Sequence, residues 1–310
     1  DAIIARLGLP PENVAFVRTA GLGETGEDRC SDGDLDRVSA CTDEMCRGVP
    51  EEDITMCALS RCDSALRGIF FRNRECLNCL AAMSGHSSET IRRYCTTRGA
   101  SRIYGGRNGI ILASRWPLRN PEAIMLPTSN ANRIAILARV DVPGRGEVEL
   151  ACTHLSSSQA IPPFHSGYDD WDEEKAAQLN MISRRLAERA GGRPQFLIGD
   201  MNFGGGDGAS IAEESGWVWN HAHELGFNDP AAYVVPRLCS LCSGNTFMGR
   251  ARSRLIDHAL LRDPPGGLTV EPTCGERLFE RPVTVPGYDG TPVVTSLSDH
   301  FGIRMKFRFR

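Results

Sequence analysis

The chain has 310 residues, of which 41% are hydrophobic and 24% are charged. These shares are near the average for globular proteins, so the composition argues against a disordered or fibrous protein. No apolar run approaches the roughly 18 residues that a membrane helix needs, and we expect no transmembrane segment. The formal net charge of −4 gives no overall attraction to polyanions, although it leaves room for a local basic groove.

The 12 cysteines are distributed unevenly along the chain. Eight of them fall between Cys30 and Cys95, and the other four are Cys152, Cys239, Cys242 and Cys274. An even number in so short a block predicts a disulfide-stapled insert over residues 28–98, and with it an oxidising compartment, extracellular or periplasmic. A structural metal site and reduced core thiols are the alternatives. No signal peptide is visible, and the sequence does not determine which cysteines pair.

The first third of the chain predicts short elements. Residues 1–8 resemble the end of an amphipathic helix, stopped by Gly8 and Pro10. Residues 14–17 are a strand candidate, and the Gly- and acid-rich residues 21–33 predict a loop. Within the cysteine block, we expect helices over residues 34–47, 54–67 and 76–83. Each has little apolar surface of its own, so disulfides between short helices would suit this region.

After Gly106 the pattern becomes that of a large domain with alternating strands and helices. The apolar run 110–114 predicts a buried strand, and residues 133–142 and 147–153 predict two strands joined by the Pro143-Gly144 turn. The helical period of residues 172–190 predicts an amphipathic helix. Further strands are expected at 195–199, between 255 and 261, and at 301–309.

Four polar clusters lie at or just beyond the ends of these expected strands. They are Thr153-His154-Leu155, Gly199-Asp200-Met201-Asn202, Leu255-Ile256-Asp257-His258 and Ser298-Asp299-His300. Strand ends are where sheet proteins usually place their functional sites.

The spacing within two of these clusters has chemical consequences. Asp200 and Asn202 are two residues apart, so on an extended backbone both side chains point the same way. A carboxylate and an amide together suit a hard cation or the alignment of a water molecule. Asp299 and His300 are adjacent, so one could hold a metal while the other meets the substrate. Taken singly, a histidine after a strand is more often structural, and Asp-x-Asn is more often a turn or a helix cap.

Taken together and in order, these clusters resemble the endonuclease/exonuclease/phosphatase superfamily. This superfamily includes pancreatic-type deoxyribonuclease, abasic-site endonucleases, inositol-phosphate phosphatases and neutral sphingomyelinases. The resemblance extends from about Asn108 to Arg310. It is carried by the run Asn108–Arg115, Thr153-His154-Leu155, Gly199-Asp200-Met201-Asn202, Ile256-Asp257-His258 and Ser298-Asp299-His300.

The resemblance implies an α/β fold: a four-layer α/β sandwich with two packed mixed β-sheets, here carrying the Cys-rich, mostly helical insert. It also implies Mg²⁺-dependent (or Mn²⁺-dependent) hydrolysis of a phosphate ester by an activated water. We expect a phosphodiester substrate, either a nucleic acid or a phospholipid head group, and we predict no protein partner.

The roles that the resemblance implies can be assigned residue by residue. Asp299 would be a metal ligand. Asp200 would activate or orient the attacking water, with Asn202 beside it contacting phosphate or metal. His300, paired with Asp257, and His154 would stabilise charge on the phosphoryl oxygens. The proposed phosphate contacts are Arg133 and Asn108.

The chain departs from the superfamily pattern near its beginning. The pattern opens with a strand ending in Asn and a second strand ending in a metal-binding Glu, and neither is present. We therefore expect residues 1–310 to form a single domain that lacks its first two strands, and we expect weak or absent activity from this chain.

The cysteine block lies outside the common core of the superfamily. It is interpreted as a stapled surface decoration or as a lid that narrows the substrate range. Cys239-x-x-Cys242 is most simply a disulfide participant, with a thiol-redox motif and a zinc ribbon as alternatives. A function of a different class would be a catalytically inactive secreted binding protein, which uses the Cys-rich insert for partner recognition.

Overall fold

The computed structural model describes residues 8–18, 30–49, 109–128, 133–158, 168–234, 237–248, 251–264, 270–286 and 291–310, with residue 6 and parts of 54–96. The helix expected over residues 1–8 and most of the loop expected over 21–33 lie outside these residues. No helix in the described part of the chain is both long and apolar enough to cross a membrane.

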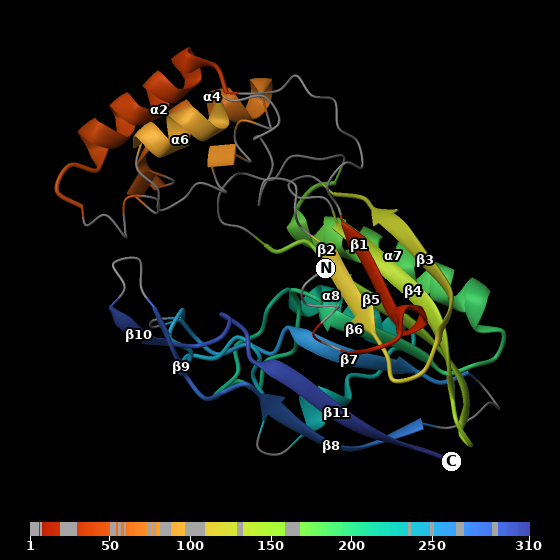
Figure 1. Ribbon diagram of the computed structural model, residues 1–310. Coiled ribbons are helices and arrows are strands. Elements are labelled where there is room, and N and C mark those ends of the chain that lie inside the picture. Colours follow the sequence, from red (N-terminus) through yellow and green to blue (C-terminus); the bar gives the residue numbers. More distant parts are fainter. Residues whose placement is uncertain are drawn as a thin grey trace.

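A five-stranded mixed sheet forms the centre of the molecule (Figure 1). Its strand order is β3-β4-β5-β6-β7. The strands are β3 (Leu118–Leu126), β4 (Arg133–Val142), β5 (Gly146–His154), β6 (Gln195–Asp200) and β7 (Asp257–Arg262). Only the β5–β6 pair is parallel, and the expected β4–β5 hairpin is confirmed. Parallel neighbours need a long crossover, which α7 (Trp171–Ala190) provides.

Alternating side chains of the sheet bury two separate cores. On β4, Ala135 and Leu137 belong to one cluster, whereas Ile136, Ala138 and Val140 belong to the other. Successive side chains of a strand point to opposite faces, so this near-continuous apolar run marks a strand covered on both sides.

Helices cover the first face of the sheet. Leu179, Ile182 and Leu186 of α7 pack there with Val218 and Ala222, which lie on α8 (Gly216–Glu224). The N-terminus of α7 is capped by Asp170, whose carboxylate accepts hydrogen bonds from two backbone N–H groups of the first turn.

Further strands cover the second face of the sheet. They are the antiparallel pairs β1 (Val14–Arg18) with β2 (Gly109–Ala113), and β8 (Val270–Leu278) with β11 (Gly302–Phe309). Phe307 of β11 meets Phe196 of β6 edge-on, with ring centroids 5.0 Å apart. A third pair, β9 (Val283–Pro286) with β10 (Pro292–Thr295), forms a separate hairpin. Two packed layers of strands and a covering helical layer confirm the predicted α/β class.

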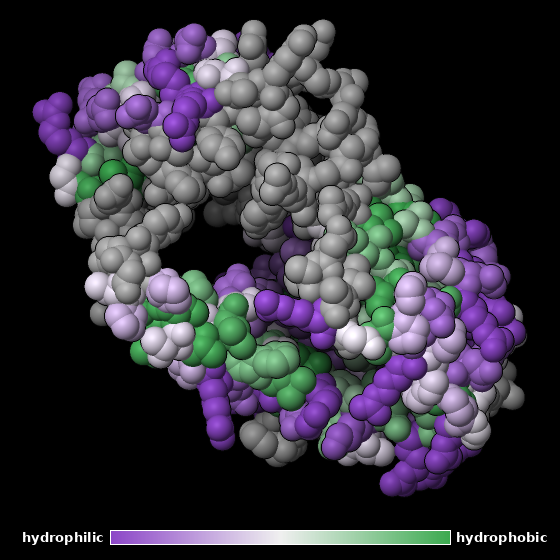
Figure 2. All heavy atoms as spheres, viewed as in Figure 1, coloured by the Kyte–Doolittle hydropathy of each residue, from purple (hydrophilic) through white to green (hydrophobic). Residues whose placement is uncertain are grey.

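The Cys-rich segment forms a helical unit with its own small core. Its helices are α2 (Asp32–Met45), α4 (Asp63–Arg72) and α6 (Ser88–Cys95), which lie together in Figure 1. Four disulfides join Cys30–Cys76, Cys41–Cys62, Cys46–Cys57 and Cys79–Cys95. Figure 2 shows hydrophilic residues over the outer surface of this unit. The prediction of a disulfide-stapled insert is therefore confirmed.

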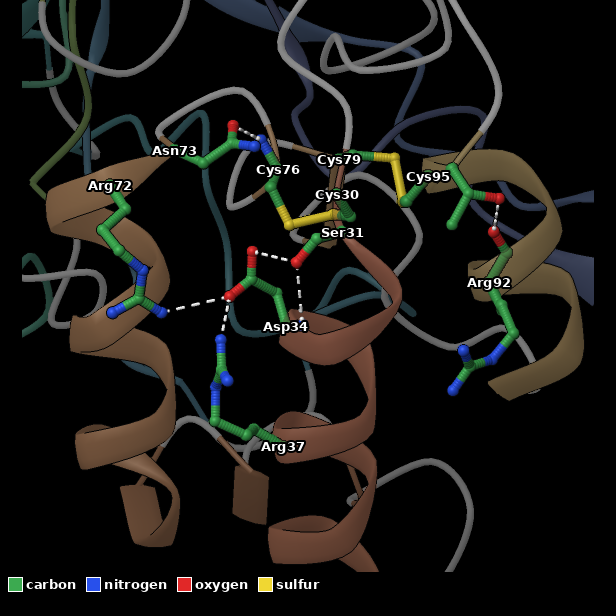
Figure 3. Close-up of a disulfide and its surroundings, with 11 residues drawn as sticks. Cys30, Ser31, Asp34, Arg37, Arg72, Asn73, Cys76, Cys79, Arg92 and Cys95 are labelled. Carbon is green, nitrogen blue, oxygen red and sulfur yellow. Dashed lines mark hydrogen bonds and ion pairs between the residues drawn. A yellow bond between two sulfur atoms is a disulfide. The ribbon is translucent and has the colours of Figure 1, made fainter.

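Asp34 connects two helices of this unit (Figure 3). Its buried carboxylate accepts hydrogen bonds from Ser31 at the start of α2, from Arg37 one turn later and from Arg72 at the end of α4. Burial disfavours its charge, but the three donors outweigh burial and lower the pKa of Asp34. A buried carboxylate with this many donors fixes how α2 meets α4.

Several predicted boundaries were wrong. The helix expected over 54–67 is divided at Cys62, which precedes α4, and α6 was not expected. Strand β3 was missed because Pro121 and its polar neighbours do not read as a strand; the pairing shifts register at this point, between Arg119 and Glu122. Strands β9 and β10 were missed because they are short and largely exposed, and β8 was missed because it is mostly polar and carries no apolar run.

Thiol counting tests the cysteine assignment. With Cys239–Cys242 the structure has five disulfides, and Cys152 and Cys274 are free. Cys274 is exposed, whereas burial raises the pKa of Cys152 to about 11. Because the thiolate is the reactive form, we expect an alkylating agent at neutral pH to modify Cys274 quickly and Cys152 slowly. Without reductant, denaturation should expose no further thiols by mass spectrometry, and additional labelled cysteines would favour the metal-site or free-thiol alternatives.

Candidate active site

Three predicted site residues lie in one row across adjacent strands. His154 ends β5 and is paired with Asp200, which ends β6, and Asp200 is paired with Asp257, which begins β7. Residues paired directly across strands point to the same face, about 5 Å apart. The β5–β6–β7 register therefore brings an imidazole and two carboxylates to one edge of the sheet.

Gly199 makes this row possible. Its φ of +130° is disfavoured for other residues, and a Cβ there would lie 2.0 Å from the carbonyl oxygen of Thr153. Three residues after Gly199, Asn202 adopts a φ of 49°, which asparagine tolerates better than most residues. Its backbone N–H donates to Oδ1 of Asp200 (2.9 Å), and its amide donates to the Leu155 carbonyl (3.0 Å). This turn fixes one oxygen of Asp200.

Two histidine–carboxylate pairs face each other at this edge. His300 donates from Nδ1 to Oδ2 of Asp257 at 2.6 Å, and Nε2 of His154 lies 3.2 Å from Oδ2 of Asp200. The side chains of Asp200, Asp257 and His300 are 16%, 26% and 22% exposed, which leaves each of them partly accessible from solvent.

The charges of the two pairs differ. Burial and the negative charge of Asp257 raise the pKa of Asp200 to about 6. Burial opposes the charged form of His300, but the hydrogen bond and charge of Asp257 outweigh it and raise the pKa of His300 to about 9. Burial and the positive charge of Arg133 lower the pKa of His154. Near neutral pH the site thus holds an imidazolium beside Asp257 and a neutral imidazole beside Asp200.

The remaining predicted residues are placed differently. Arg133 begins β4 and is close enough for its charge to act on His154 and Asp200. Asp299 is exposed, and its carboxylate accepts a hydrogen bond from the Ser298 hydroxyl at 3.1 Å. Its charge contributes to the raised pKa of His300. Asn108 lies outside the described residues.

One group of side chains among the described residues could hold a metal ion. Asp200, Asp257 and His300 each offer a ligand atom, and these atoms lie within 4.8 Å of one another. Two carboxylates at adjacent strand ends are a donor set that suits Mg²⁺ or Mn²⁺. Asp257 and His300 were predicted as catalytic residues and not as ligands, so their place in this group was not anticipated.

His258 follows Asp257 on β7 and is buried behind the site, and the sequence analysis assigned it no role. It is fully buried; Nε2 donates to the Phe203 carbonyl (2.7 Å), and Nδ1 lies 2.9 Å from Oδ2 of Asp229. Burial opposes its charge, but Asp229 outweighs burial and raises the pKa of His258. The sequence pattern could have indicated that His258 is buried. Adjacent residues of a strand point to opposite faces, and Asp257 was already expected on the face of the site.

Lys175 is a second supporting residue, and it is buried completely. Its ammonium group donates to the carbonyl of Asn202 (3.1 Å) and to the hydroxyls of Ser158 (2.7 Å) and Ser215, and lies 3.0 Å from Asp172. It therefore fixes the turn after Asp200 against the start of α7. One feature of the sequence indicates that Lys175 is buried, because it adjoins the apolar side of the expected helix.

The close approach at Gly199 can be tested by substitution. Gly199→Ala should lower the free energy of unfolding by at least about 3 kcal/mol, because the methyl group meets the Thr153 carbonyl in a backbone conformation that alanine disfavours. Gly208→Ala is the matched control; its φ is +73°, but no atom lies within 4 Å of the added Cβ. The control should cost about 1–2 kcal/mol in urea denaturation. Equal losses for both variants would contradict the steric account.

Comparison with family models and with curated proteins finds no match. Solved structures do match. They include an endonuclease/exonuclease/phosphatase from Beutenbergia cavernae DSM 12333 (19% identity, 65% of this chain and 47% of that chain, TM-score 0.41). They also include D. rerio TDP2 complexed with a single-strand DNA product (17% identity, 64% of this chain and 72% of that chain, TM-score 0.44). A third is sphingomyelinase C from Streptomyces griseocarneus (17% identity, 64% of this chain and 67% of that chain, TM-score 0.43). The chain spans less than half the length of the first.

Proposed function

We propose that the protein is a divalent-metal-dependent phosphoesterase that hydrolyses a phosphodiester. The observation that carries this proposal is the pair of histidine–carboxylate contacts, His154–Asp200 and His300–Asp257, at one edge of the sheet. Phosphoryl transfer to water requires a positioned nucleophile and positive charge around the phosphoryl oxygens. The two pairs offer groups of both kinds.

Asp200 is the group that would orient and deprotonate the attacking water. Its Oδ1 is occupied by the Asn202 N–H, whereas Oδ2 faces His154 and the site. A general base is most effective when its pKa is near the working pH. Burial and the charge of Asp257 raise the pKa of Asp200 toward that range. The water oxygen forms the new bond to phosphorus as the bond to the leaving oxygen breaks.

Positive charge would come from His300 and Arg133. His300 is held as an imidazolium by Asp257, so it can donate a charge-assisted hydrogen bond to a phosphoryl oxygen. Arg133 begins β4 beside the same row and would contact the phosphate, as we propose for Asn108 as well. Neutral His154 would donate or accept a hydrogen bond without adding charge.

The side chains of this edge fit a divalent cation. Asp200 and Asp257 would supply carboxylate oxygens, and we propose Asp299 and Asn202 as further oxygen ligands from the neighbouring turns. A bound Mg²⁺ or Mn²⁺ would supply Lewis-acid stabilisation of the phosphoryl oxygens. Asp257 binds His300 through Oδ2, which leaves its Oδ1 for the cation.

The disulfides and the net charge support our proposals for the compartment and the substrate class. Five disulfides are typical of an oxidising environment, so we propose an extracellular or periplasmic protein. The net charge of −4 does not favour strong duplex binding, which leaves a nucleic acid and a phospholipid head group as the two substrate classes.

Hydrolysis assays test this proposal. We expect Mg²⁺-dependent turnover with at least one of plasmid DNA, RNA, sphingomyelin and bis-p-nitrophenyl phosphate. His300→Ala should lower kcat by about 10²–10⁴-fold, because it removes the imidazolium from the site. His221→Ala is the matched control, because His221 is a partly exposed histidine of α8 that contacts Asn180 and Glu224, and it should leave kcat unchanged.

Cation binding tests the metal assignment without relying on turnover. Mg²⁺ or Mn²⁺ should raise the melting temperature in a concentration-dependent way, since a ligand that binds only the folded state stabilises it. Asp200→Asn should abolish this shift, and Asp299→Asn should weaken it if Asp299 is a ligand. Absence of both a shift and cation-dependent hydrolysis would contradict the enzyme proposal and favour a binding protein on the same scaffold.

A further inference from the structure

The loop that precedes β7 contacts both partners of the Asp257–His300 pair. Ser240 lies at its centre and is completely buried. Its hydroxyl oxygen accepts hydrogen bonds from the backbone N–H groups of Ile256 and Asp257, both at 3.1 Å. One side chain thus fixes the backbone at the point from which Asp257 projects.

The same loop holds the chain on either side of His300. The Ser240 carbonyl accepts a hydrogen bond from the Phe301 N–H at 2.8 Å. The buried amide of Asn245 donates to the Ser298 carbonyl at 2.7 Å. Asp257 and His300 are 43 residues apart in the sequence, yet their backbones are attached to one loop of a few residues.

A disulfide closes this loop around Ser240. Cys239 and Cys242 are bonded to each other and are only 5% and 3% exposed. The Cys242 carbonyl accepts a hydrogen bond from the Asn245 N–H at 2.9 Å, and Arg277 of β8 donates to the sulfur of Cys239 at 3.1 Å. The covalent bond and these contacts leave the Ser240 backbone little freedom.

We propose that Ser240 and Asn245 are positioning residues that set the Asp257–His300 hydrogen bond, and that the Cys239–Cys242 disulfide fixes the loop for this purpose. The catalytic consequence rests on the proposed function, whereas the structural one does not. A 2.6 Å charge-assisted bond requires both partners to be placed within a few tenths of an ångström. Partners that orient active groups in this way are typically worth about 10- to 100-fold in affinity or activity.

The experiment compares Ser240→Ala, Asn245→Ala and the double variant Cys239→Ala/Cys242→Ala with the parent protein. The matched control is Cys46→Ala/Cys57→Ala, which removes a disulfide of the Cys-rich unit, away from the site. The first measurement is the downfield proton NMR signal of the His300 Nδ1–H, assigned by its loss in His300→Ala. The second is kcat and KM with the substrate that the parent hydrolyses.

We expect the three loop variants to shift or broaden the His300 signal and to lower kcat by about 10- to 100-fold with KM little changed. The control should keep both the signal and kcat, even though losing a disulfide lowers its melting temperature. A folded Ser240→Ala with an unchanged signal and unchanged kcat would overturn the inference, as would a control that behaves like the loop variants.

Two further outcomes are informative. If the double cysteine variant does not fold, Ser240→Ala and Asn245→Ala decide the question, since each removes a single side chain. If the parent hydrolyses nothing, the NMR signal alone decides whether the loop positions His300. In that case the proposed function fails while the structural inference can still stand.

Discussion

The parallel pairing of β5 with β6 is the constraint on which the site depends. Thr153 and Gly199 are partners in this pairing, and the backbones approach so closely that only glycine fits. The approach places His154 and Asp200 level with each other, and the antiparallel β7 then adds Asp257 to the same row. Any slip of one residue would turn these side chains to opposite faces of the sheet.

The crossover helix that makes parallel pairing possible also supports the site chemically. From Leu179 onward, α7 is apolar toward the sheet, with Leu179, Ile182 and Leu186 in the core. Its N-terminal half instead buries polar side chains. Gln178 binds the backbone of Ser156, just after His154, and Lys175 binds the carbonyl of Asn202. One helix therefore completes the fold and fixes the two turns that follow β5 and β6.

A buried pair of charged side chains, His258 and Asp229, also supports the strand that carries Asp257. The His258–Asp229 pair lies in the core on the side opposite Asp257. Such pairs contribute little net stability, because desolvation offsets their attraction, but removing one partner is costly. Their effect is to specify one arrangement of β7 and the turns around it. Polar contacts also hold the backbone at Ser240 and Asn245, in addition to the apolar packing of Cys239, Cys242 and Phe301 around them.

The sequence predicted the fold and the candidate site well where a local pattern allowed only one interpretation. Polar residues at the ends of apolar strands indicated His154, Asp200 and Asp257 as candidates, and strand ends collect at sheet edges: His154 and Asp200 end β5 and β6, and Asp257 begins the antiparallel β7. It was uninformative where several partners were possible. Eight cysteines in one block allow many pairings, and β3, with Pro121 in a polar stretch, does not show the usual strand pattern. Ser240 could not be recognised, since nothing in its neighbourhood indicates that its hydroxyl accepts from the strand carrying Asp257.

Each disulfide closes within a single region of the chain. Four join cysteines between Cys30 and Cys95, and the fifth joins Cys239 to Cys242. No covalent bond among these ties the Cys-rich unit to the sheets. The unit therefore obtains its stability from its own staples and core, while the site depends on hydrogen bonds and strand register. A substitution in the core of the Cys-rich unit therefore need not disturb the geometry around Asp257 and His300.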